Sequence, residues 1–132
     1  MNPAKLSPRL ATDICGQCHS VWQPTTETES ERSLGEGFSF RPGQRLEESK
    51  YTIHRKTIPE PRVKAIQVAA GGSATFLVDR YWADGLVRIT GREYAAHLDS
   101  PCFADAKSDD ETLSCLSCHE MHQRTDDPRP WQ

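Results

Sequence analysis

Two short segments of the chain share one pattern of chemically active residues. Residues 15–19 read Cys-Gly-Gln-Cys-His, and residues 115–119 read Cys-Leu-Ser-Cys-His. Two thiols three positions apart lie on one side of a helical turn, where both can form thioether bonds to the vinyl groups of one haem. The histidine that follows can then supply an axial nitrogen to the iron. The pattern predicts two covalently bound haem c groups, held by Cys15, Cys18, His19, Cys115, Cys118 and His119.

The same four cysteines also form two Cys-x-x-Cys pairs, a spacing that zinc sites and dithiol redox sites use. In a zinc ribbon the two pairs are separated by roughly 15–20 residues, whereas here the first pair ends at Cys18 and the second begins at Cys115. Zinc also gives no reason for a histidine after each pair. A zinc-stabilised interaction module is therefore the alternative to haem.

A six-coordinate haem needs a second axial ligand, and three further histidines are candidates. His122 follows His119 by three residues, so both point to the same side of a helix. His122 can therefore reach the neighbouring haem of the first motif rather than the far face of its own. The second haem would then take His54 or His97. Such bis-histidine ligation favours a lower reduction potential than histidine–methionine ligation.

No nucleophile–base pattern, phosphate loop or carboxylate pair stands out in the sequence. An electron carrier is therefore favoured over an enzyme, although a haem with one open axial position would support enzymatic chemistry. Met121 is expected to pack against a porphyrin, and Cys102 to be a small buried residue. Arginines at positions 80, 88 and 92 can pair with haem propionates. The aromatic residues expected in a core around the haems are Tyr51, Phe76, Tyr81, Trp82 and Tyr94.

The composition is that of a small domain with a thin apolar core. Of the 132 residues, 36% are hydrophobic and 27% charged, so a large cofactor would help to fill the interior. A net charge of −3 gives no electrostatic reason to expect nucleic acid or an anionic membrane as a partner. The apolar runs are too short to span a bilayer. The expected partners are redox proteins.

Haem c is attached outside the cytoplasm, so the motifs predict a periplasmic or extracellular location. The N-terminal residues Met1–Lys5 lack the apolar stretch of a secretory signal. Both observations are compatible if the chain is part of a larger exported protein.

Local patterns indicate which elements position the motifs. Residues 10–22 are expected to form a short helix or turn around the first motif, with Thr12 or Asp13 as N-cap. Residues 24–50 are expected to be a flexible loop, anchored only by Phe38 and Phe40. Residues 74–82 and 86–91 flank an Asp-Gly turn and predict a β-hairpin.

The C-terminal third is expected to contain two helices and a tail. Residues 91–98 predict a helix ended by Ser100-Pro101, and residues 109–122 predict a helix that carries the second motif. Residues 124–132 read as a tail. The sequence predicts a mostly irregular, small α+β fold. It would be a single loop-rich dihaem domain over residues 1–132, with short helices at the motifs and one β-hairpin.

These segments together resemble bacterial multihaem c-type cytochromes with a doubled Cys-x-x-Cys-His motif, which are often joined to tetratricopeptide repeats. The resemblance implies haem attachment in the periplasm or outside the cell and a role in carrying electrons. Unlike the larger members, this chain has two motifs and no repeat array. The segments that carry the likeness are residues 14–19, 40–46, 82–88, 91–94, 100–103 and 113–122.

Overall fold

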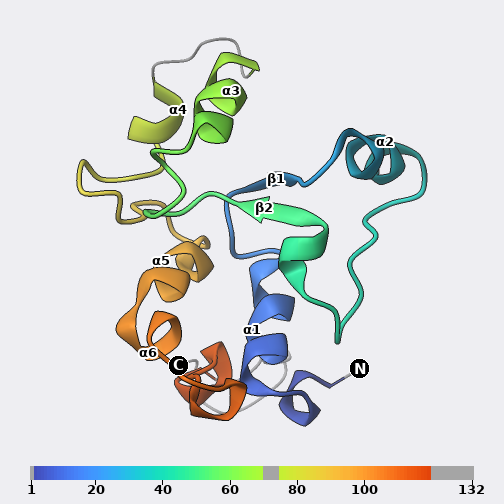
Figure 1. The fold of residues 1–132 in the computed structure, drawn as a ribbon, viewed down its shortest axis with the longest axis vertical. Coiled ribbons are helices and arrows are strands. Elements are labelled where there is room, and N and C mark those ends of the chain that lie inside the picture. The colour runs from blue at the N-terminus through green and yellow to red at the C-terminus, as the bar shows by residue number, and fades with distance from the viewer. Residues whose placement is uncertain (1, 70–74, 120–132) are drawn as a thin grey trace, which may run out of the picture.

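A two-stranded antiparallel sheet connects the first motif to the middle of the chain. The computed structural model describes residues 2–69 and 75–119. In it, β1 (Trp22–Pro24) pairs with β2 (Lys50–Thr52), and Trp22 lies opposite Thr52. Because β1 follows closely after His19, the pairing holds the exit of the first motif against residues 50–52 (Figure 1).

Short helices make up most of the remaining regular structure. Pro8 begins α1 (Pro8–Gly16), where its fixed φ suits the first turn. The side chain of Thr26 caps α2 (Glu27–Gly35) by accepting the amide of Glu29. The other helices are α3 (Pro61–Ala69), α4 (Thr75–Val78), α5 (Glu93–Asp99), α6 (Pro101–Ala104), and the 3₁₀ turns η1 (Pro3–Lys5), η2 (Leu46–Glu48), η3 (Asp109–Glu111) and η4 (Cys115–Ser117).

Buried apolar side chains form two separate clusters. One contains Val21, Ile53, Val63 and Tyr81, with Leu77 and Val87 among the half-buried residues around it. The other contains Phe40, Leu46 and Tyr94, flanked by Ile14 and Leu98. The second cluster lies directly behind the first motif, because Ile14 immediately precedes Cys15.

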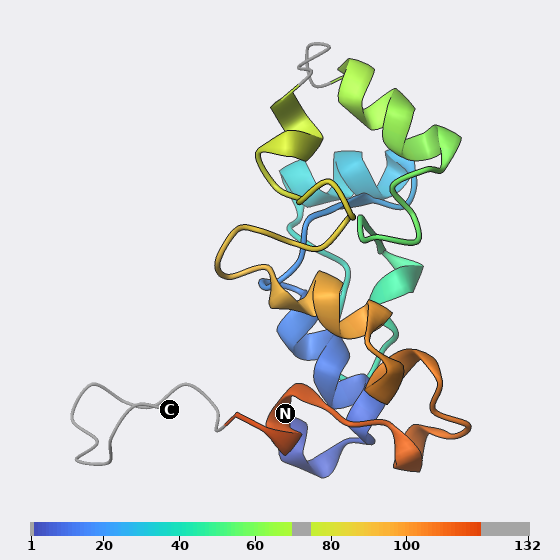
Figure 2. The ribbon, with the colours of Figure 1, turned by 90° about the vertical axis from the view of Figure 1, so that its left-hand side faces the viewer.

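The elements are arranged so that the two motifs lie in the same part of the molecule. Helices α3 and α4 lie at one end, and α1, α5 and α6 lie at the other (Figure 1). In both views the segment from Asp109 to His119 lies beside α1 (Figure 2). The chain therefore brings its C-terminal motif back to the helix that ends in the N-terminal motif.

The predicted small, irregular α+β fold is confirmed. The predicted helix at residues 91–98 is α5, and Ser100 and Pro101 stand at its end as expected. Within residues 2–69 and 75–119, no helix has the length and apolar character needed to cross a membrane.

The predicted hairpin is wrong in extent. Residues 75–78 form α4, and the chain reverses at Gly85 (φ 84°) with a single antiparallel bridge between Tyr81 and Val87. The β-branched and aromatic residues of segment 74–82 favoured a strand. Among the described residues around the turn, however, pairing is limited to the Tyr81–Val87 bridge, so no strand extends from it. The sheet that does form, β1 with β2, was not predicted.

Three further predictions need correction. Residues 24–50 contain α2, η2 and the first residue of β2, and Leu46 and Lys50 there are buried, so this stretch is not a loop anchored by phenylalanines alone. Thr12 and Asp13 lie inside α1 rather than at its N-cap. The expected helix at 109–122 consists of η3 and η4 with extended residues between them, and residues 120–122 lie outside the described part.

Two side chains expected in the interior are exposed. Trp82 is 57% exposed, whereas Tyr81 and Tyr94 are buried as predicted. Cys102 is also exposed, because it begins the first turn of α6 on the surface.

Candidate haem-attachment site

Both Cys-x-x-Cys-His segments fold into the same hydrogen-bonded turn. In the first motif the carbonyl of Cys15 accepts the amides of Cys18 at 3.2 Å and His19 at 2.9 Å. In the second motif the carbonyl of Cys115 accepts the amides of Cys118 at 3.3 Å and His119 at 2.9 Å. The shared turn puts the two cysteines of each motif and its histidine in matching backbone positions.

Different elements produce these two turns. The first is the last turn of α1 continued beyond Gly16. The second is η4, where the amide of Ser114 donates to the hydroxyl of Ser117 at 3.0 Å. Ser117 is one of the two variable residues of the motif, and its hydroxyl stabilises the start of the turn.

The second motif docks directly on the helix that carries the first. The amide of Cys115 donates to the hydroxyl of Thr12 at 3.3 Å, across 103 residues of sequence. Thr12 lies three residues before Cys15 on the same side of α1, so this contact brings Cys115 next to Cys15, close enough for the two thiols to affect each other's pKa. The Cys15 thiol also lies 3.7 Å from the carbonyl oxygen of Ala11. The first cysteines of the two motifs therefore meet at one point.

The hydrogen bond between the thiols makes them chemically unequal. Donation from Cys115 lowers the pKa of Cys15 to about 7, against the opposing effect of burial. The pKa of Cys115 is raised, because it supplies the proton of this bond and is half-buried. Cys15 is thus the nucleophilic partner near neutral pH, since the thiolate is the reactive form.

The remaining groups of the two motifs face outward. Cys18, Cys118 and His119 are exposed. The His19 side chain is 40% exposed, and its Nδ1 lies 3.5 Å from Glu93. These exposed thiols and imidazoles are accessible from solvent to a group as large as a porphyrin.

A buried carboxylate positions the helix of the first motif. Asp13 is 2% exposed and accepts three hydrogen bonds, from the Tyr94 hydroxyl at 2.7 Å, from Arg45 Nε at 2.9 Å and from the Leu46 amide at 3.3 Å. These partners come from η2, α5 and the residue before η2. Asp13 thereby links α1 to η2 and to α5 immediately behind Cys15. The sequence pattern had indicated only an N-cap role for this residue.

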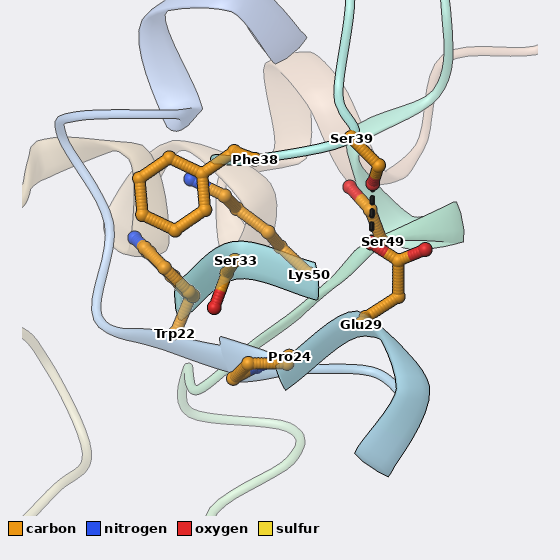
Figure 3. A pocket seen from close by; sticks show the side chains of 8 residues that line it. All are labelled: Trp22, Pro24, Glu29, Ser33, Phe38, Ser39, Ser49 and Lys50. Carbon is orange, nitrogen blue, oxygen red and sulfur yellow. Dashed lines mark hydrogen bonds between the residues drawn. The ribbon is translucent and has the colours of Figure 1, made fainter. Parts of the chain in front are cut away.

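A buried lysine supports the first motif from the sheet. Lys50 is 2% exposed, and its ammonium lies 3.7 Å from the ring centre of Trp22 and 4.2 Å from that of Phe38 (Figure 3). It also lies 3.3 Å from the carbonyl oxygen of Gln17, within the motif. Burial lowers the pKa of Lys50. The hollow beside these residues in Figure 3 has little free space, so it serves packing rather than ligand binding.

The two described candidates for a distal ligand are held in different ways. His54 Nδ1 lies 2.8 Å from a carboxylate oxygen of Asp99, so Nδ1 donates to it, and in the neutral imidazole Nε2 is then the nitrogen with the free lone pair. His97 Nε2 lies 2.9 Å from the carbonyl oxygen of Leu113 and therefore donates to it. The third candidate, His122, and Met121 lie outside the described residues.

The arginines that could pair with haem propionates each contact backbone carbonyls of the protein. Arg80 donates to the carbonyl of Phe76 and Arg88 to that of Val78. Arg92 donates to the carbonyl of Cys18 at 2.8 Å, so it alone of the three contacts a motif. Arg88 also borders a hollow of about 420 Å³ beside Trp82.

The four motif cysteines do not gather into a metal site. Across the described ranges 2–69 and 75–119, no three His, Cys, Asp or Glu side chains are placed to hold one metal ion together. All five cysteines are free thiols. Comparisons of the chain with protein-family models, with curated proteins and with solved structures find no match.

Proposed function

We propose that this chain is an electron-transfer domain that carries two covalent haem c groups, one at each Cys-x-x-Cys-His motif. The observation that carries the proposal is the pairing of the motifs. Two segments that share the Cys-x-x-Cys-His pattern adopt the same turn and lie side by side, although they are 100 residues apart in the sequence. A chance match in an unrelated domain gives no reason for this juxtaposition.

The donor set of each motif suits the group. Cys15 and Cys18 would form the thioether bonds to one haem, and Cys115 and Cys118 those to the other. His19 and His119 would be the proximal axial ligands, since each follows its second cysteine directly. When bound, each haem supplies an iron that alternates between ferric and ferrous states.

The protein around the motifs keeps the two attachment points close and fixed. Thr12 anchors the second motif to α1, and Asp13 anchors α1 to η2 and α5. Electron transfer between two centres depends steeply on their separation. A scaffold that holds η4 against α1, and so keeps the two attachment points close, therefore suits a relay of electrons to a redox partner protein.

Among the described candidates, His54 is better prepared than His97 to be a distal ligand. Asp99 holds Nδ1 of His54 in the manner of the carboxylates that orient metal-binding histidines, and this leaves Nε2 available. His97 uses its Nε2 to donate to Leu113, so only Nδ1, which is hindered by the adjacent Cβ, would be left for an iron. His122 stays the prediction for the haem of the first motif.

The first test is to export the chain in a host with c-type haem maturation, then record a pyridine haemochrome spectrum and measure iron per chain. We expect two covalent haems. The matched variants Cys15→Ala/Cys18→Ala and Cys115→Ala/Cys118→Ala should each retain one. Protein with bound zinc and no haem would overturn the proposal in favour of the interaction module. Two haems of which one is high-spin would instead favour a haem enzyme.

A further inference from the structure

The contact between Cys15 and Cys115 has chemistry of its own in the chain before haem is attached. Each sulfur must bond a vinyl carbon of a different haem in the loaded protein, so a hydrogen bond between them belongs to the haem-free form. A pair of thiols in contact across a folded interface is the arrangement from which a disulfide forms. Neither thiol has to leave its element to reach the other.

We propose that Cys15 and Cys115 form a reversible disulfide in the haem-free chain, which locks the second motif onto α1 and blocks one thioether position in each motif. The inference goes beyond the proposed electron-transfer role and does not depend on it, because it concerns the haem-free chain, whatever that chain later binds.

The oxidant is a small-molecule disulfide such as oxidised glutathione. The Cys15 thiolate attacks one sulfur of the oxidant, and the first glutathione leaves as a thiolate. Cys115 then loses its proton and attacks the Cys15 sulfur, so the second glutathione leaves. In total, two protein thiols lose two electrons and two protons, one protein disulfide forms, and one glutathione disulfide becomes two glutathione thiols.

The partners of each thiol favour this pairing over disulfides within a motif. Cys15 and Cys115 are half-buried where η4 docks on α1, whereas Cys18 and Cys118 are exposed at the outer ends of their turns. The interface that holds the pair includes the Thr12 contact to the backbone of Cys115 and the His97 contact to Leu113. Neither contact involves a thiol group, so the interface does not depend on a bond between the two sulfurs.

The test uses the full haem-free chain, equilibrated with mixtures of reduced and oxidised glutathione, quenched with acid, alkylated and digested with trypsin. The two motifs lie on different tryptic peptides, so a disulfide between motifs links two peptides and one within a motif does not. We expect the linked pair to predominate. Predominant disulfides within each motif would overturn the inference.

Two matched variants identify the cysteines. The first, Cys18→Ser/Cys102→Ser/Cys118→Ser, keeps only Cys15 and Cys115. The second, Cys15→Ser/Cys102→Ser/Cys115→Ser, keeps only Cys18 and Cys118. We expect the first to oxidise at least about tenfold more favourably against glutathione than the second. Circular dichroism of both reduced variants checks that they are folded, and equal oxidation of two folded variants would contradict the proposal.

Oxidation should also change the stability of the first variant. The disulfide would close a ring that includes nearly the whole described chain, which restricts the unfolded state. We expect the melting temperature to rise by at least about 5 °C on oxidation and to return on reduction. A fall in melting temperature would show that the native contact cannot accommodate the bond.

Discussion

Gly16 and the ring of Tyr94 are in such close contact that no side chain fits between them. A Cβ added to Gly16 would lie 2.7 Å from Tyr94 and 2.8 Å from the side chain of Leu46. Gly16 is the first variable residue of the N-terminal motif. Its identity is therefore set by the packing of α1 against α5 and η2, separately from any chemistry of the motif.

Gly16→Ala should destabilise the protein. The Tyr94 hydroxyl is bound to Asp13, so the ring cannot move away without loss of that bond, and we expect a cost of about 1–3 kcal/mol. Urea unfolding followed by circular dichroism measures it. Gly35→Ala is the control, because Gly35 ends α2 with no atom within 4 Å of the added Cβ. Alanine there should be neutral or slightly stabilising. Equal effects at both positions would contradict the packing argument.

Removal of the Asp13 carboxylate should lower the free energy of unfolding more than removal of any one of its hydrogen-bond partners. Asp13→Ala leaves the Tyr94 hydroxyl and the Leu46 amide without their acceptor, and Arg45 without its buried partner. We expect a loss of about 3–5 kcal/mol in the free energy of unfolding. Tyr94→Phe, which removes one hydrogen bond, should cost about 1–2 kcal/mol. Asp105→Ala, at an exposed site, serves as the control.

Cys15 should become reactive at a lower pH than an ordinary cysteine. Its pKa of about 7 lies below the ordinary value of 9.0, so the thiolate forms as the pH rises through 7. In Cys18→Ser protein, alkylation of Cys15 by iodoacetamide should be half-maximal near pH 7. In addition, Cys115→Ala removes the hydrogen-bond donor, so the pKa should rise and the rate at pH 7 should fall at least about tenfold. An unchanged profile would mean that Cys115 does not cause the shift.

The two histidines should respond differently in the haem-loaded protein. His54→Ala should leave one iron without a distal ligand, visible as a high-spin signal in the absorption and electron paramagnetic resonance spectra. His97→Ala should leave both irons low-spin. It should lower stability by about 1–2 kcal/mol, because it removes the Leu113 hydrogen bond and an edge contact with Phe103. A high-spin signal in His97→Ala alone would reverse the assignment.

Local signals in the sequence were sufficient for some elements and insufficient for others. Helix α5 is flanked by Gly91 and by Ser100-Pro101, and these residues predicted its limits to within two positions. The turn at Gly85 was also predicted. The strands β1 and β2 were not, because Trp-Gln-Pro and Lys-Tyr-Thr are too short to show alternation. Their pairing depends on the tertiary structure around them.

The candidate site shows the same division. The two motifs were recognised because their spacing is local, and their shared turn is a local property as well. The approach of Cys15 to Cys115, the contact of His54 with Asp99 and the links made by Asp13 all depend on contacts between residues 32 to 103 positions apart in the sequence. No spacing rule reports such distances. Asp13 was mistaken for an N-cap because aspartate at the start of a helix is so often one.

The contact between η4 and α1 also bears on the order of assembly. Closing so long a segment of chain carries a large entropic cost, and contacts of this sequence separation form late and slow the folding of a domain. The first motif emerges during synthesis 100 residues before the second. During this interval Cys115 has not yet been synthesised, so the Cys15 thiol is accessible to modification.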